Sequence, residues 1–341
     1  MAGRQRSLRD GCDAQPAVIQ NDRNRPYRVV GSNGVSEMMQ VLRNADVAHV
    51  NGLSIRAISV SSLANRRPVV THAGYQAICP AGLAWSARGL CSVTTQSSDR
   101  CSVCPRAGLS GRAKVQLHRA GAAAAAVNVC VSQYLAERVS VPRSVTIYNP
   151  VSDRAFKADL GSDQQDQVVV FAGRLVAEKG LDVLLRALAM LPGVRLRVAG
   201  DGPMRAVWQR LAAEIGVGDR TEFLGAMSLT ELGDLYADAA VVCVPSAWEE
   251  PFGYVAAEAM AMGRAVVATP SGALPELLAD GRGFVAAAST PKVLAETLLA
   301  ALEDDERRKS SERKARDFAL SDLSIECVGP KYEALYGTVA S

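Results

Sequence analysis

The sequence predicts an α/β protein of two doubly wound domains, each built on a parallel sheet. Short β-branched runs alternate with amphipathic helical stretches, and several of these runs end in glycine. The length of 341 residues also favours two domains, because single hydrophobic cores stop growing near about 250–300 residues. We expect a first domain over residues 1–158, a second over 159–321, and a final helix over 322–341 that packs back on the first.

The first half carries weaker strand signals than the second. Its candidate strands are Tyr27–Val30, Val47–Val50, Pro68–Thr71, Val127–Val131 and Ser144–Ile147. Residues 1–26 are polar and rich in arginine and show no periodicity, and a cysteine-rich insert spans residues 79–104.

The second half shows the alternation clearly. Its candidate strands are Val168–Phe171, Val194–Val198, Thr221–Leu224, Ala240–Val244, Ala265–Ala268 and Gly283–Val285. Helices are predicted over Leu181–Leu191 and Met204–Ile215, where apolar residues recur at three- and four-residue spacing. Gly173, Gly200 and Gly225 follow three of the strands, where ligands meet the carboxyl ends of a parallel sheet.

Composition and charge narrow the class of protein. With 48% hydrophobic and 21% charged residues, the chain is not mainly disordered or collagen-like. No apolar run approaches the roughly 20 residues that span a bilayer, and no apolar stretch follows Arg4, Arg6 and Arg9 as in a secretory signal. We therefore expect a cytoplasmic location.

The two halves differ in charge. Residues 1–165 hold 20 Lys or Arg and 10 Asp or Glu, whereas the remainder holds 18 and 25. A basic half indicates either a contact with an anionic surface or a solvated arginine-rich face, and the charge alone leaves both open. No aromatic stacking platform accompanies the basic residues, so we expect no nucleic-acid partner.

A first motif follows the strand at Val168–Phe171. Gly173 and Arg174 are followed by Lys179 and Gly180 just before a predicted helix. Two cations beside a helix N-terminus suit a diphosphate. The alternative is a surface loop whose Glu178 and Lys179 merely cap the helix.

A second motif follows the strand that ends at Val244. It contains Glu250, Phe252, Gly253, Tyr254 and, within the next helix, Glu258. Gly253 allows close backbone approach, so the first N–H groups of the helix can bind phosphate. A carboxylate at Glu258 can accept hydrogen bonds from two vicinal hydroxyls. The apolar residues around it make an exposed position less plausible, and a buried carboxylate needs a partner.

Together these motifs resemble the retaining nucleotide-sugar glycosyltransferases of family 4. The resemblance begins near Tyr27 and rests on the order and spacing of several motifs rather than on any one. They are Asp46–His49, Thr71-His72, Ile147–Pro150, Gly173–Gly180, Gly200–Pro203, Phe223–Gly225, Glu250–Glu258 and Gly272–Glu276. It implies the GT-B architecture, in which two Rossmann-like domains face each other across a cleft.

The resemblance also implies roles for individual residues. Arg174 and Lys179 would hold the diphosphate of the donor, and Glu258 would bind its ribose. Glu250 and the N–H groups of Gly253 and Tyr254, after Phe252, would contact the donor sugar and phosphates. Phe223 and Leu224 would line the base pocket, whose wall is shaped by the turn at Gly200. His72 would face the donor from the opposite domain, although a single histidine after a strand can equally be structural.

The activity so implied is sugar transfer with retention of anomeric configuration. The donor would be a UDP- or GDP-sugar, and the acceptor a lipid-linked, polysaccharide or glycoconjugate molecule, as in cell-envelope polysaccharide biosynthesis. A phosphate oxygen is thought to take the acceptor's proton, so no protein nucleophile is required. The chain has no Asp-x-Asp triplet, and we expect no catalytic metal. The basic first half would meet an anionic membrane surface from the cytoplasmic side.

The cysteines indicate a separate site. Cys79, Cys91, Cys101 and Cys104 cluster in the irregular insert, and disulfides are unusual in a cytosolic protein. One Cys-x-x-Cys pair with two further thiols makes this cluster a candidate structural zinc site. Free thiols are the alternative.

Two other classes of protein share features with this sequence. A nicotinamide dehydrogenase shares the fold, but no Gly-x-Gly-x-x-Gly follows a strand here. A catalytically impaired remnant that still binds a nucleotide sugar also fits. The match begins only near Tyr27, without an opening strand and glycine-rich loop, so we expect a truncated first domain and weak or no transfer by this chain.

Overall fold

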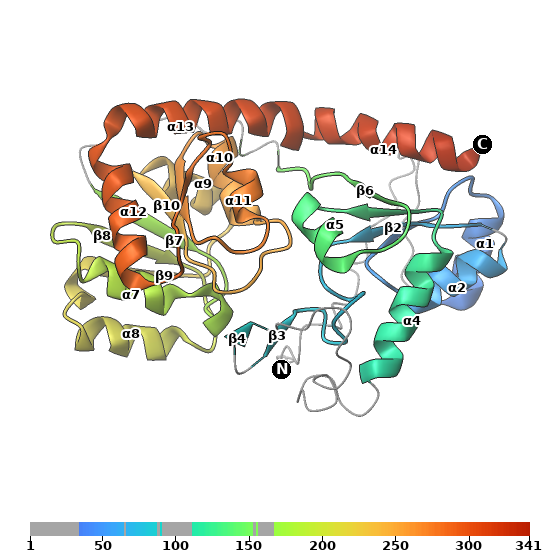
Figure 1. The fold of residues 1–341 in the computed structure, drawn as a ribbon, viewed down its shortest axis with the longest axis horizontal. Coiled ribbons are helices and arrows are strands. Elements are labelled where there is room, and N and C mark those ends of the chain that lie inside the picture. The colour runs from blue at the N-terminus through green and yellow to red at the C-terminus, as the bar shows by residue number, and fades with distance from the viewer. Residues whose placement is uncertain (1–33, 65, 87–88, 91–110, 153–154, 156–166) are drawn as a thin grey trace, which may run out of the picture.

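The computed structural model describes residues 34–64, 66–86, 89–90, 111–152, 155 and 167–341. They form two α/β domains, which lie side by side beneath a long helical segment at the C-terminus (Figure 1). Each domain has its own parallel sheet, so the predicted fold class is confirmed.

The first sheet has four parallel strands in the order β1-β2-β5-β6. Their bounds are β1 His49–Asn51, β2 Val69–His72, β5 Val127–Cys130 and β6 Ser144–Thr146. These confirm four of the strands predicted for this half, while Tyr27–Val30 lies outside the described residues. The helices here are α1 Val35–Arg43, α2 Ile55–Leu63, α4 Gly111–Ala124 and α5 Gln133–Val139, and a short ribbon pairs β3 Trp85–Ser86 with β4 Gly89–Leu90.

Both faces of the first sheet are covered, which explains the continuous apolar run of β2. Val69 on one face packs in a cluster with Val328 of the C-terminal helix. Val70 on the other face shares a core with Ile58 of α2 and Ala122 of α4. A strand buried on both faces shows no alternation of apolar and polar residues.

The second sheet has six parallel strands in the order β12-β11-β10-β7-β8-β9. Their bounds are β7 Val168–Ala172, β8 Arg195–Ala199, β9 Thr221–Gly225, β10 Val241–Val244, β11 Ala265–Ala268 and β12 Phe284–Val285. All six strands predicted for this half are therefore confirmed. The chain adds strands on one side of β7 and then returns to add the rest on the other side, which is the Rossmann order.

Helices cover both faces of the second sheet. They are α7 Leu181–Leu188, α8 Arg205–Glu214, α9 Leu229–Ala237, α10 Tyr254–Ala261, α11 Leu274–Leu277, α12 Pro291–Glu303 and α13 Asp305–Phe318, with 3₁₀ turns at Ala177–Lys179 and Gly218–Arg220. The predicted helices over 181–191 and 204–215 correspond to α7 and α8. The N-terminus of α9 is closed by a capping box, in which the side chains of Ser228 and Glu231 each accept a hydrogen bond from the other's backbone N–H.

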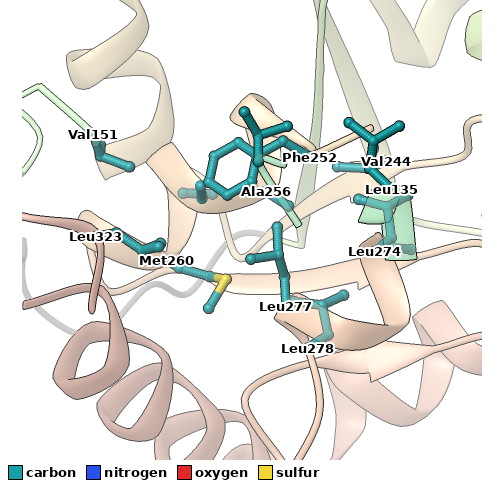
Figure 2. Close-up of a cluster of buried hydrophobic side chains, with 14 of the residues drawn as sticks. Leu135, Val151, Val244, Phe252, Ala256, Met260, Leu274, Leu277, Leu278 and Leu323 are labelled. Carbon is teal, nitrogen blue, oxygen red and sulfur yellow. The ribbon is translucent and has the colours of Figure 1, made fainter. Parts of the chain in front are cut away.

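Alternate residues of the second sheet belong to two separate cores. Val169 and Phe171 of β7 pack with Leu184 of α7 in one cluster. Val168 and Val170 face the other side, in a cluster that includes α10 and reaches residues of the first domain. Figure 2 shows part of this second cluster, in which Phe252, Met260 and Leu277 of the second domain accompany Leu135 of α5.

The C-terminal segment joins the domains. After α13 a π-helical turn over Ala319–Leu323 leads into α14, Ile325–Ala340, which lies over the first sheet (Figure 1). Tyr336 of α14 bonds to His49 of β1 with 2.6 Å between Oη and Nδ1, and Tyr332 stacks on the same imidazole. Among the described residues, no helix is both long and apolar enough to cross a membrane.

Candidate functional site

The candidate site lies where the strand order of the second sheet reverses, between β7 and β10. The connections that leave these neighbouring strands run to opposite sides of the sheet, and ligands of open α/β sheets bind in the crevice this leaves at the strand ends. The loop after β7 carries Gly173, Arg174 and Lys179. The loop after β10 carries Glu250 and Gly253. The fold therefore brings together two motifs that are some 70 residues apart in the sequence.

Two glycines let the loops of this edge touch. A Cβ on Gly200 would lie 1.8 Å from the carbonyl oxygen of Gly173, and Gly200 has a φ of +132°. A Cβ on Gly272 would lie 2.2 Å from the backbone nitrogen of Glu250, and its φ is +64°. Any side chain at either position would push a loop out of place, so both glycines are required by sterics as well as by conformation.

Lys179 and Glu250 form an ion pair at the centre of the site. The Lys179 Nζ lies 2.6 Å from Oε1 of Glu250, and the same oxygen accepts a 2.9 Å hydrogen bond from Oγ of Ser246. The Glu250 side chain is 8% exposed and that of Lys179 is 20% exposed. Lys179 also lies 5.3 Å from the ring centroid of Trp248, a cation–π geometry. The pairing holds Lys179 in place, while its side chain keeps some exposure to solvent.

Arg174 is the second cation predicted for this edge. It is exposed and follows Gly173 directly after β7. Within the part of the chain that the structure describes, no ion pair involves it. Its guanidinium is thus available to an anion, whereas the charge of Lys179 is partly balanced by Glu250.

Helix α10 begins at the same edge. Gly253 precedes it with a φ of +98°, and Tyr254 at its first turn is 51% exposed. Phe252 is buried, with its ring 5.2 Å from that of Tyr254, and so anchors the start of the helix. The first N–H groups of a helix have no acceptor within the helix, so this start can receive an anionic group.

Glu258 lies half-buried on α10 beyond this start. Burial raises the pKa of its carboxyl group, and the structure gives it no hydrogen bond among the described residues. The hydroxyl of Tyr236 on α9 is buried without a partner, and the pKa of Tyr236 is raised by burial and by the charge of Glu258. An unpaired buried carboxylate is costly, and a ligand with hydroxyl donors would relieve that cost. Sequence reasoning missed Tyr236, which looks like an ordinary apolar helix position.

The remaining second-domain residues frame the edge. Gly200 directly follows β8, and Phe223 and Leu224 near the end of β9 are half-buried. Arg205, which the sequence did not indicate, donates from Nη2 to the carbonyl oxygen of Phe223 at 3.1 Å. It fixes the backbone at the end of β9 in place.

His72 ends β2 in the first domain and is fully buried. Its Nε2 lies 2.8 Å from Oδ1 of Asn128 on β5. The Asn128 amide donates to the carbonyl oxygens of Ala122 and Pro142, so its oxygen accepts and Nε2 of His72 is the protonated nitrogen. Burial lowers the pKa of the imidazole, and its Nδ1 has no partner among the described residues. His72 is therefore held as a neutral imidazole, and its role toward a donor stays a prediction.

The predicted zinc ligands fall mostly outside the description. Cys91, Cys101 and Cys104 are not among the described residues, and Cys79 is half-buried and not in a disulfide. The described residues contain no group of three or more His, Cys, Asp or Glu side chains placed to hold a metal ion. The zinc site therefore stays a prediction.

The first domain contacts the second motif directly, through residues that sequence reasoning did not select. Tyr75 donates its hydroxyl to the carbonyl oxygen of Glu249 at 2.7 Å, and Oγ of Ser132 donates to that of Pro251 at 2.6 Å. Arg138 pairs with Glu249 at 3.2 Å, and the Trp248 indole N–H donates to the carbonyl oxygen of Leu83. These contacts cannot be predicted from a local sequence pattern, because they join residues that are far apart in the sequence.

The two parallel-sheet α/β domains define the GT-B class of fold, and the comparisons agree with this. Solved structures of similar fold include Anabaena HepE in complex with UDP, with a TM-score of 0.71 and 20% identity over 89% of this chain and 82% of that one. A sucrose-phosphate synthase from Thermosynechococcus elongatus has a TM-score of 0.69 and 19% identity over 89% of this chain and 78% of that one. The predicted GT-B architecture is confirmed.

Sequence comparison gives the family. Residues 152–318 match glycosyl transferases group 1 and belong to that family. Similar curated proteins include the D-inositol 3-phosphate glycosyltransferase of Mycolicibacterium smegmatis, 42% identical over 140 residues that cover 40% of this chain and 32% of that protein. A protein of the same name from Mycobacterium tuberculosis is 43% identical over 141 residues, covering 40% and 29%. The matched region spans about a third of the length of these relatives.

Proposed function

We propose that this chain transfers a sugar, with retention of anomeric configuration, from a nucleoside-diphosphate sugar to a lipid-linked or glycan acceptor. The family of residues 152–318 supports the reaction class. Solved neighbours of the same fold were determined with UDP and with UDP-glucose, which favours a UDP-sugar over a GDP-sugar as the donor to test first.

The observation that carries the proposal is the convergence at the β7–β10 edge. Arg174 follows β7 and is exposed, Lys179 of the same loop is paired with Glu250, and α10 begins after Gly253 in the loop of the neighbouring strand. All three groups favour negative charge at one place. A diphosphate is the ligand that such an arrangement suits.

The chemistry follows from where charge develops. When the bond between sugar and diphosphate breaks, negative charge grows on the leaving phosphate, and fixed cations and N–H groups stabilise it in the transition state. Glu258 would accept from the two ribose hydroxyls and so orient the donor. Glu250 is held through Oε1 by Lys179 and Ser246, and its second oxygen would contact the donor sugar. In this proposal no side chain serves as a nucleophile.

The acceptor would bind on the first-domain side of the site. We propose a place in cell-envelope polysaccharide biosynthesis, with the chain in the cytoplasm at the inner face of the membrane. The excess of basic residues before residue 165 supports contact with anionic lipid, at about 1 kcal/mol for each basic residue near the surface. Sedimentation with anionic vesicles should weaken as salt rises, and equal binding to neutral vesicles would contradict this.

The site assignment is tested by UDP binding to the purified chain. Calorimetry without added metal should detect binding that EDTA leaves unchanged. Arg174→Ala should weaken it by about 1.5–3 kcal/mol, the range for hydrogen bonds to charged groups. Arg313→Ala, an exposed arginine of α13, is the matched control and should bind as the wild type does. Unchanged affinity in Arg174→Ala, or loss of binding in EDTA, would show that the diphosphate binds elsewhere.

Turnover separates the enzyme from a binding remnant. A panel of UDP- and GDP-sugars is incubated with the chain and candidate acceptors, and release of nucleoside diphosphate is followed. Acceptor-dependent release establishes transfer, whereas tight UDP binding without release would favour the catalytically impaired alternative.

Elemental analysis of the same reduced preparation tests the structural zinc proposed for Cys79, Cys91, Cys101 and Cys104, and a preparation without metal would leave these as free thiols.

A further inference from the structure

The carboxylate of Glu276 joins the two domains. It belongs to α11 in the second domain, yet all three of its hydrogen-bond donors lie in the first. Its Oε1 accepts from the backbone N–H of Gln133 at 2.9 Å and from the Tyr148 hydroxyl at 2.8 Å, and its Oε2 accepts from the N–H of Tyr134 at 2.9 Å. The two N–H groups are the first of α5, which have no acceptor within their own helix.

The segment before Glu276 is fastened to the loop that carries Glu250. The backbone N–H of Ala273 donates to the carbonyl oxygen of Glu250 at 2.8 Å, and Oγ of Ser271 donates to that of Trp248 at 2.8 Å. Gly272 lies so close to Glu250 that no Cβ would fit between them. Residues 271–276 are therefore tied to the Glu250 loop, and a group that holds Glu276 also restrains that loop.

Further contacts connect the same two regions. Ser132, which caps α5 through a 3.0 Å bond from the N–H of Leu135, also donates to the carbonyl oxygen of Pro251. Leu135 of α5 packs in the same apolar cluster as Leu274 of α11 (Figure 2). The pKa of Tyr148 is raised by burial and by its bond to Glu276, so its hydroxyl remains a donor at neutral pH. Glu276 is the charged member of this contact, to which three donors converge.

We propose that Glu276 is a positioning residue that fastens the Glu250 loop of the second domain to α5 of the first, and so sets the domain arrangement needed for sugar transfer. Nucleotide binding itself would not depend on it, because Arg174, Lys179, Gly253 and Glu258 all belong to the second domain. The inference rests on the proposed function for its catalytic consequence, whereas the contact itself can be tested without turnover.

The experiment compares Glu276→Gln with the wild type and with Glu296→Gln, an exposed glutamate of α12 that serves as the control. In Glu276→Gln an amide nitrogen replaces one carboxylate oxygen. Because this nitrogen cannot accept a hydrogen bond from a backbone N–H or a hydroxyl group, the contact between Glu276 and the first domain weakens, while the side-chain volume is kept. We expect kcat for transfer to fall by about 10- to 100-fold, about 1.4–2.7 kcal/mol at about 1.36 kcal/mol per tenfold. The Kd for UDP should stay within about twofold, and Tyr148→Phe, which removes one donor of three, should have a smaller effect.

Hydrogen exchange gives a readout that does not need activity. The amides of Gln133 and Tyr134 should exchange faster in Glu276→Gln by about the same factor, and at the wild-type rate in Glu296→Gln. Unchanged exchange at these amides overturns the proposal, as does a loss of UDP affinity equal to the loss of kcat, since Glu276 would then only support the nucleotide site. If the wild type fails to bind UDP, the proposed function fails, and the exchange rates still decide whether Glu276 holds the first amides of α5.

Discussion

The described strands of the two sheets differ in order, and the reversal in the second sheet leaves an edge where a ligand can bind. In the second sheet the chain builds outward from β7 on one side and then from β10 on the other, so the loops after these two neighbours part. In the described part of the first sheet the strands follow one another in chain order, β1-β2-β5-β6. The connections between these four strands all lead in the same direction across the sheet, and the described order shows no reversal.

The two domains also contribute different kinds of groups where they meet. The second domain presents a constellation of charged and N–H groups at its strand reversal. The first domain presents a helix start and hydroxyl groups, from Tyr75, Ser132 and Tyr148, that contact the backbone and a carboxylate of the second. The reversal in the second sheet thus creates an edge where a ligand can bind, and the described part of the first domain supplies contacts to the loop at that edge.

The largest expected effect is a loss of stability in the core of the second domain. Leu184 of α7 is fully buried against the second sheet, and Leu184→Ala should lower the unfolding free energy of that domain by about 2–5 kcal/mol. Urea unfolding followed by tryptophan fluorescence, to which the buried Trp208 of the same cluster contributes, measures it. Leu299→Ala, at a 40% exposed site of α12, should change stability by about 0.5 kcal/mol or less. A small loss in Leu184→Ala would mean that this core does not carry the domain.

A smaller effect is expected where α14 covers the first sheet. Val328 is 1% exposed and packs with Val69 and Val129, so Val328→Ala removes two buried methyl groups and should cost about 1–2 kcal/mol. The loss should appear in thermal unfolding and should leave UDP affinity unchanged, because the contact lies on the first sheet. Val207→Ala, at a 42% exposed site of α8, is the control. A drop in UDP affinity would show that the two sheets are more tightly coupled than their separate cores indicate.

The smallest expected change concerns Glu258 and depends on pH. Because burial raises the pKa of this carboxyl group in the folded state, folding opposes its ionisation, and its contribution lowers stability as pH rises from the unfolded pKa through the folded one. Glu258→Gln should therefore be more stable than the wild type at pH 7, and the difference should vanish below about pH 4. Thermal unfolding at both pH values checks this.

The same variant should bind UDP more weakly, because the amide cannot replace a carboxylate that accepts from two hydroxyls. Glu222→Gln, at an exposed carboxylate of β9, is the control. A variant that is less stable at pH 7 would contradict the unpaired burial of Glu258. Stability gained together with affinity lost is the pattern expected of a binding residue that folding alone does not favour.

Much of the fold was predictable because its signals are local. Every strand predicted after residue 160 is present, since a buried parallel strand is a short β-branched run bounded by glycine and helix caps. Within the candidate site, Arg174, Gly253 and Glu258 could be proposed from the sequence because their motifs follow such strands. Tyr236 and Arg205 were missed, since a tyrosine or an arginine within a helix carries no positional signal of its own.

The sequence by itself determined the order of the elements, the family of residues 152–318 and the glycines that the crowded loops require. Only the tertiary structure decided that Lys179 is paired with Glu250, that His72 is a buried neutral imidazole bonded to Asn128, and that Glu276 reaches α5. Periodicity and turn chemistry act over a few residues and can be seen in a single segment. The Glu276 contacts join residues 128 to 143 positions apart, and they depend on how two separately formed domains pack together.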